Sequence, residues 1–279
     1  IRVERQGTIG KRDHGADILT EISQCECRTG ERVGILGRRL QGTAIELSNE
    51  SNTGATQMSA QSFLEITYPT LDLLKGIEAV GPGQGRPVVV IGKRGLGKSH
   101  LMAALYHAAH DPASTKSWLD SWSVTLGDPQ IGSITLRESM LVLGESLHRH
   151  RYKSLWDVLF DRHPHGAYIK GKWEGMGPAK PPIPSDLLIL ELLRHTPTML
   201  LLDEFQTWYE SLSDTKQYLW KQWAFNFIQI LSEIAKEHPE LLVLVVSVRD
   251  GTSDASQQIH RENPVPVNFE AGGSPDRIA

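Results

Sequence analysis

A lysine and a serine stand at the end of a glycine-rich segment, at a spacing that suits the binding of phosphate groups. Residues 92–99 read GKRGLGKS, so Gly92 is followed after four residues by Gly97, Lys98 and Ser99. Glycines let successive backbone N–H groups converge on an anion, and the ammonium group adds positive charge. A seryl hydroxyl is a ligand that Mg²⁺ accepts. The pattern predicts a loop that holds the phosphates of ATP together with Mg²⁺.

The whole segment from Gly92 to His100 is predicted to contact this ligand. Lys98 is expected to reach the β- and γ-phosphates, and Ser99 to bind the metal. The predicted contact residues are Gly92, Lys93, Arg94, Gly95, Leu96, Gly97, Lys98, Ser99 and His100. The alternative is a glycine-rich turn that carries a surface lysine. An apolar run before the loop and a helical pattern after it favour the phosphate loop.

An acidic pair further along the chain supplies the second half of a hydrolytic site. The segment TMLLLDEF places Asp203 and Glu204 directly after a short apolar run. A magnesium nucleotide needs a carboxylate at the carboxyl end of a strand, and Asp203 suits this role, acting through a water molecule. Glu204 is placed to polarise the attacking water as a general base. Alone, such acids commonly mark a strand that meets solvent; with the phosphate loop, they predict ATP hydrolysis.

These residues need a parallel sheet to bring them together. Short apolar runs that suit buried strands occur at 87–91, 139–144, 198–203 and 240–248. Each run is followed by a helical or loop pattern, and this alternation predicts an α/β fold in which helices flank a parallel sheet. The segment NPVPVNFEA predicts a fifth strand at an edge, because its prolines do not fit a central strand.

Three helices are predicted around these strands. Residues 71–80 have apolar side chains near helical spacing, and residues 98–110 are rich in Ala and Leu. A longer helix is predicted to begin at Ser213, as its cap, and to end before Pro239.

The composition is that of an ordinary soluble protein. The chain has 279 residues, of which 39% are hydrophobic and 22% charged, and a formal net charge of -4. This balance excludes a protein that holds nucleic acid by bulk charge alone, although a local basic groove stays open. No apolar run approaches the roughly 20 residues that cross a bilayer, so no membrane partner and a cytoplasmic location are expected.

Two regions are predicted from the change in pattern along the chain. Residues 1–60 form an extension of unclear structure that ends in a polar stretch, and residues 61–279 form the core. The sequence is also expected to be a piece of a longer protein.

Histidines gather at positions 148, 150, 163 and 165. The interpretation is a solvated, partly basic surface beside a buried Trp156, and a metal site would require convergence that spacing does not show. The basic segment HRHRYK contains one aromatic residue, so it indicates nucleic-acid binding only weakly.

The glutamate beside the metal-binding aspartate is typical of the additional-strand ATPases, a class that includes AAA+ proteins. In that class another strand lies between the phosphate-loop strand and the acidic strand, and residues 240–248 are the candidate. Ser247 falls where the class has a polar sensor of the γ-phosphate; the alternative is a serine that merely ends a buried strand. Arg261 matches the position of an arginine finger, which reaches the γ-phosphate of a neighbouring subunit; the alternative is a solvated surface arginine.

Three stretches resemble one bacterial family in particular. The stretches are FLEITYPTLDLLKGIEAV, RPVVVIGKRGLGKSHLMAALYHAAHDP and LLLDEFQTWYE. Together they resemble the AAA+-like ATPases known as domain of unknown function 499, over roughly residues 60 to 270. TYPT and GKSHLMAALYH are more specific than the phosphate loop itself.

The resemblance implies a function in phage defence. Members look like large proteins in which the ATPase comes first, often encoded beside DNA methyltransferases in defence loci of the BREX kind. It implies ATP and Mg²⁺ as ligands, Lys98, Ser99, Asp203 and Glu204 as site residues, and a homo-oligomer, a methyltransferase or other defence proteins as partners. DNA is a further partner that the charge does not indicate. Residues 1–60 match nothing in the family, and the helical lid that the resemblance implies after the core is expected to be absent from residues 1–279, together with its adenine contacts.

Two functions are therefore weighed. The first is an ATP-hydrolysing motor or switch in a defence complex. The alternative is a nucleotide-gated scaffold with little turnover. The presence of both Asp203 and Glu204 favours the first, because a pure binder has little use for a carboxylate that activates water.

Overall fold

The structure is a computed structural model, and it describes residues 47, 54–149, 151–253, 259 and 263–269. The chain divides into two compact units, residues 1–44 and 45–279, and all described residues belong to the second. The predictions for Arg261, for His150 and for most of residues 1–60 therefore lie outside the described residues.

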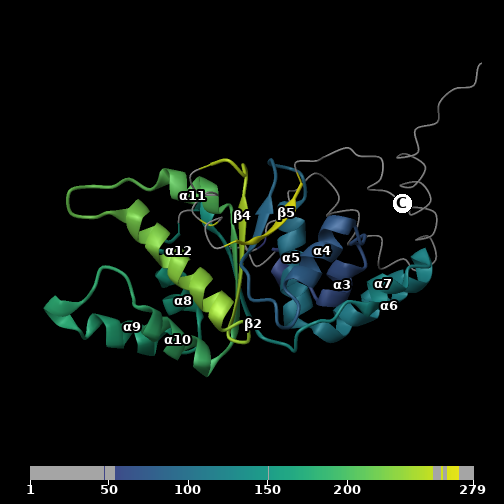
Figure 1. Cartoon of the computed structure of the whole chain (residues 1–279), viewed down its shortest axis with the longest axis horizontal. Coiled ribbons are helices and arrows are strands. Elements are labelled where there is room, and N and C mark those ends of the chain that lie inside the picture. The colour runs from purple at the N-terminus through teal and green to yellow at the C-terminus, as the bar shows by residue number, and fades with distance from the viewer. Residues whose placement is uncertain (1–46, 48–53, 150, 254–258, 260–262, 270–279) are drawn as a thin grey trace, which may run out of the picture. The chain divides into compact units, whose positions relative to one another are not determined.

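Parallel strands form a five-stranded sheet in the order β2-β3-β4-β1-β5 (Figure 1). Their bounds are β1 Val88–Ile91, β2 Leu141–Ser146, β3 Thr198–Asp203, β4 Leu242–Val248 and β5 Val265–Asn268. The predicted α/β class is confirmed. The fifth strand is the edge strand that its prolines predicted, with Pro266 paired to Val89 of β1.

The central strands are buried on both faces because their apolar residues alternate between two cores. Leu200 and Leu202 of β3 belong to one core, while Met199 and Leu201 belong to the other. All residues of β1, β3 and β4 are buried, as expected for a parallel sheet covered on both sides.

Two layers of helices supply the rest of these cores. One face is covered by α3 (Ala60–Leu64), α4 (Leu71–Ala79), α5 (Lys98–His110), α6 (Pro112–Leu126) and α7 (Pro129–Ser133). The other is covered by α8 (Leu155–Arg162), α9 (Gly166–Glu174), α10 (Asp186–His195), α11 (Phe205–Ser211) and α12 (Trp220–Glu237). Short 3-10 turns are η2 (Ala55–Gln57), η3 (Leu147–Arg149) and η4 (Gly177–Ala179). Figure 1 shows the sheet between the two layers.

The helices predicted at 71–80 and 98–110 are confirmed, and α5 begins directly after the glycine-rich loop. Within the described part of the chain, no helix combines the length and apolar character needed to cross a bilayer.

The predicted start of the long helix is wrong. α12 begins at Trp220 rather than Ser213. Residues before it form a turn in which Tyr218 N donates to Thr215 Oγ1 at 3.0 Å. The carboxylate of Asp214 reaches forward to accept from the amide of Lys221, at 2.8 Å, in the first turn of α12. The hydrogen bond that satisfies the helix start therefore comes from Asp214.

β2 extends two residues beyond the predicted run and includes a buried charge. Glu145 is 3% exposed, and its Oε2 accepts from Arg162 Nη1 of α8 at 2.9 Å. The same nitrogen donates to Gly144 O. Because the carboxylate has a charged partner, Glu145 can lie near the end of this buried strand, and an apolar pattern alone does not detect it there.

Candidate functional site

The loop between β1 and α5 has the backbone that its glycines predicted. Gly95 has φ +85° and Gly97 has φ +100°, in the left-handed region that favours glycine. A Cβ at Gly95 would meet nothing within 4 Å, so the glycine is required by the backbone conformation and not by packing. Gly97 is the residue at the N-terminus of α5, whose first amide groups give this end of the helix a positive potential.

Gly92 is required for a different reason. A Cβ on Gly92 would come within 2.7 Å of the Cβ of Phe269, which follows the edge strand β5. The amide of Gly92 also donates to Val248 O of β4 at 3.2 Å. The first residue of the loop is therefore in contact with the end of β4 and with the residue that follows β5, the two strands that flank β1.

Lys98 is buried against this loop. The residue is only 6% exposed, and its Nζ donates to Gly92 O at 2.6 Å and to Lys93 O at 3.1 Å. Burial holds the pKa of Lys98 below its ordinary value of 10.5, while the nearby charges of Glu204 and Asp203 oppose this shift. The ammonium group thus lies within electrostatic range of both predicted acids.

Hydrogen bonds join the two motifs at the carboxyl ends of the strands. Ser99 Oγ donates to Asp203 Oδ2 at 2.7 Å, and the hydroxyl of Ser247 donates to Asp203 Oδ1. Asp203 is 3% exposed and Ser247 is fully buried. β4 lies between β1 and β3, so the strand expected between the two motif-bearing strands is present and carries Ser247 at its end.

Glu204 directly precedes α11, as its N-cap, in an unusual backbone conformation. Its φ is +58°, one of the positive values found at non-glycine residues. Its amide donates to Asp203 Oδ1 at 3.0 Å and to Ser247 Oγ at 2.9 Å, and its Oε2 accepts from Thr207 Oγ1 at 3.0 Å. A left-handed non-glycine residue costs about 1–2 kcal/mol and persists where its surroundings fix it.

His100 joins the loop to the segment that precedes β1. Thr67 Oγ1 donates to Phe63 O at 2.8 Å, so the hydroxyl oxygen accepts from His100 Nε2, at 3.0 Å. Burial holds the pKa of His100 below its ordinary value of 6.5, which favours the neutral ring in this contact. The Thr67 to His100 contact links TYPT with GKSHL, and spacing alone gave no sign of it.

The other predicted site residues are placed as follows. Leu96 is 41% exposed, and Lys93 and Arg94 are also exposed on the loop. Arg261 lies outside the described residues.

Among the residues that the structure describes, no group of three or more His, Cys, Asp or Glu side chains suits a metal ion. Ser99 and Asp203 still fit Mg²⁺. Their two oxygens are in contact at 2.7 Å beside an open loop. Mg²⁺ commonly takes one or two protein ligands and completes its shell with water and phosphate.

The histidine surface differs from the prediction. His163 is buried, at 4% exposure, with Nδ1 accepting from His165 N at 3.1 Å and Nε2 facing Thr196 O at 3.1 Å. His165 stacks on His195, with ring centroids 4.2 Å apart. Trp156 is buried as expected. His163 is a core residue because the backbone satisfies both of its nitrogens.

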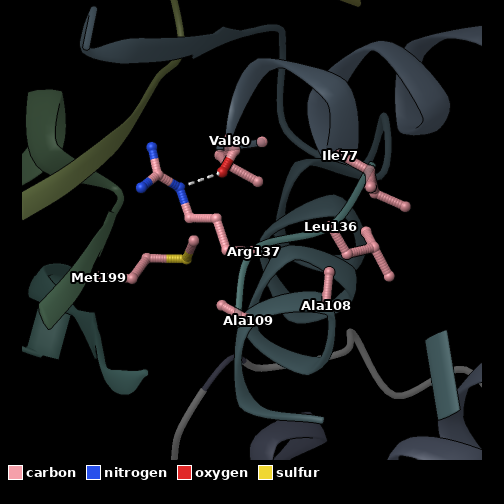
Figure 2. A pocket seen from close by; sticks show the side chains of 8 residues that line it. Ile77, Val80, Ala108, Ala109, Leu136, Arg137 and Met199 are labelled. Atoms are coloured by element: carbon pink, nitrogen blue, oxygen red, sulfur yellow. Dashed lines mark hydrogen bonds between the residues drawn. The ribbon is translucent and has the colours of Figure 1, made fainter. Parts of the chain in front are cut away.

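A small cavity lies at the other end of the sheet (Figure 2). It is lined by Ile77, Val80, Gly81, Ala108, Ala109, Leu136, Arg137 and Met199. Met199 is near the start of β3, whereas Asp203 ends that strand. With about 10 Å³ of free volume, it has room for one water molecule at most. The guanidinium of Arg137 there donates to the carbonyls of Val80, Gln84 and Pro239, which indicates a structural role.

Fold and site together define an α/β protein in which one strand separates the strand leading into residues 92–97 from the strand ending in Asp203. No protein family matches the sequence, and no curated protein is detectably similar to it. Among solved structures, the chain is similar to AMPPCP-bound DnaA from Aquifex aeolicus, with 15% identity and a TM-score of 0.29. The alignment covers 83% of this chain and 51% of that one, so the chain spans about half the length of that structure. No residue role follows from so distant a likeness.

Proposed function

We propose that the chain binds Mg-ATP between the glycine-rich loop and the end of β3 and hydrolyses it. The observation that carries this proposal is the 2.7 Å hydrogen bond from Ser99 to Asp203, which joins residues of two distant motifs in one site. Beside it lie a loop with left-handed glycines, a buried ammonium group and a second carboxylate, Glu204. These are the groups that phosphoryl transfer to water requires.

Each residue has a role in the proposed reaction. The loop amides and Lys98 bind the β- and γ-phosphates, and Lys98 exchanges its contacts with the loop carbonyls for phosphate oxygens. Ser99 and Asp203 hold Mg²⁺, which supplies charge neutralisation on the phosphates when bound. Glu204 accepts a proton from the attacking water. Ser247 donates to Asp203 and orients that carboxylate.

Two substitutions test this assignment. Lys98→Ala is expected to weaken Mg-ATP binding at least about tenfold, because a charge-assisted contact to phosphate is lost. Glu204→Gln is expected to bind normally and to release phosphate about 10²–10⁴-fold more slowly. Binding is measured with a fluorescent ATP analogue, and turnover by steady-state phosphate release.

Lys75→Ala is the matched control, because Lys75 is exposed on α4 and belongs to neither motif. It is expected to leave both measurements unchanged. If Glu204→Gln and the unmodified protein turned over equally fast, Glu204 would have no part in the mechanism. If Lys98→Ala bound Mg-ATP as tightly as the unmodified protein, the glycine-rich loop would not be the phosphate site.

We further propose that this ATPase is a motor or switch in a phage-defence complex that acts with a DNA methyltransferase. The support is the resemblance of the stretches around TYPT, GKSHLMAALYH and LLLDEFQTWYE. Phosphate release is expected to rise when DNA and the methyltransferase encoded nearby are added. A rate that ignores both would contradict the defence role while leaving ATP hydrolysis intact.

A further inference from the structure

Gln206 is a buried amide side chain in the first turn of α11, two residues after Glu204. It is 3% exposed, and Phe205 and Trp208 of the same helix are also buried. An amide that is removed from water and left without partners is costly, so a polar residue here requires an explanation.

The side chain has partners at both ends. Its Oε1 accepts from the amides of Arg249, at 3.0 Å, and Asp250, at 2.9 Å, directly after β4. Its Nε2 donates to Glu210 Oε1 at 2.7 Å, one turn further along α11. Glu210 Oε2 in turn faces Arg249 Nη2 at 3.5 Å. Gln206 therefore ties the start of α11 to the chain that leaves β4.

This tie bears on Glu204 through the backbone. Glu204 has φ +58°, and its amide is held by Ser247, the next-to-last residue of β4. Ser247 thus fixes one side of the turn to β4, and Gln206 fixes the other side to the residues just beyond β4. A strained backbone conformation of this kind persists where the surrounding contacts fix it.

We propose that Gln206 is a positioning residue, which holds the Glu204 carboxylate in place by anchoring α11 to the backbone after β4. The inference rests on the proposed ATP hydrolysis. Gln206 touches neither the glycine-rich loop nor Lys98 in the contacts that the structure records, so its effect is expected on the chemical step and not on nucleotide binding.

Removal of the side chain gives the first test. Gln206→Ala is expected to lower kcat for phosphate release about 10- to 100-fold, with KM for Mg-ATP within about twofold, because a small displacement of a reacting group is costly. Gln61→Ala is the matched control: Gln61 Nε2 also donates to a glutamate one turn later, Glu65, at 3.3 Å, but on the exposed surface of α3. Its kcat is expected to stay at the unmodified value.

An exchange of the two polar side chains gives the second test. Gln206→Glu keeps an acceptor for the two amides but sets a second carboxylate against Glu210, so kcat is expected to fall. Adding Glu210→Gln restores a donor between the pair, and the double variant is expected to return to within about threefold of the unmodified kcat. Thermal unfolding of each variant is measured alongside. An exchange that restores the unfolding midpoint without restoring kcat would overturn the proposal.

Glu204→Gln is assayed beside these variants, so that two failures stay distinct. If Glu204→Gln turns over as fast as the unmodified protein, the proposed hydrolysis fails. If Glu204→Gln is slow and Gln206→Ala keeps the unmodified kcat, the hydrolysis stands and the role of Gln206 is overturned.

Discussion

Gly95 and Gly97 have backbone angles that other residues adopt only with strain, and nothing lies within 4 Å of the position where a Cβ on Gly95 would stand. The loop is thus open where its amides turn. Its shape is set by backbone conformation, and the residues around it do not fill that space. Substitution of a glycine in this loop can therefore be used to measure the loss of stability and the loss of anion binding separately.

Gly95→Ala is expected to lower the free energy of unfolding by about 1–2 kcal/mol and also to weaken Mg-ATP binding. Gly83→Ala is the control, since Gly83 has φ +74° and equally open surroundings in the loop before β1. It is expected to cost the same stability and to leave binding unchanged. Urea unfolding and nucleotide titration measure the two effects. Equal binding in the two variants would contradict the role given to the loop.

Single residues also show where sequence patterns stop being informative about the site. Lys98, Ser99, Asp203 and Glu204 were predicted because their spacing follows from what a phosphate and a metal require. Their roles stay predictions, but the structure brings their side chains together. Gln206 gave no such signal, because its partners are backbone amides after another strand, and any sequence has backbone amides there.

At the scale of elements, the start of α12 gives a second prediction. The Asp214 carboxylate accepts from the amide of Lys221, whereas Ser213 was the predicted cap. Asp214→Ala is expected to lower the free energy of unfolding by about 1 kcal/mol, the usual value for a lost cap. Ser213→Ala is expected to change it by less than about 0.5 kcal/mol. Urea denaturation measures both, and a larger loss in Ser213→Ala would restore the sequence-based assignment.

The strands were more predictable than the helix ends. Apolar runs located β1, β3 and β4 within two residues, because burial on both faces leaves a continuous signal. The predicted end of β2 lay two residues too early, because Glu145 is buried by its pairing with Arg162 and this contact joins distant residues. The predicted start of α12 was wrong for a related reason, because the capping side chain is seven residues away from the amide whose hydrogen bond it accepts.

On the scale of the whole molecule, the two helix layers enclose histidines, wholly or in part, whose protonation is disfavoured. Burial holds the pKa values of His100, His107 and His163 below their ordinary value of 6.5. For His163 the contacts show why. Nδ1 accepts from the amide of His165, so Nε2 carries the proton that is donated to Thr196 O. A second proton would have to break the first of these bonds.

The sign of the pH effect follows from these shifts. Below about pH 6.5 the unfolded chain takes up protons that the folded histidines bind more weakly, so stability falls as pH is lowered. The thermal midpoint is therefore expected to drop between about pH 7.5 and pH 5.5, a range in which ordinary carboxylates stay ionised. His163→Gln is expected to reduce this slope, because one of the three contributions is removed. A midpoint that is constant over this range would show that the buried histidines accept protons without cost in the folded protein.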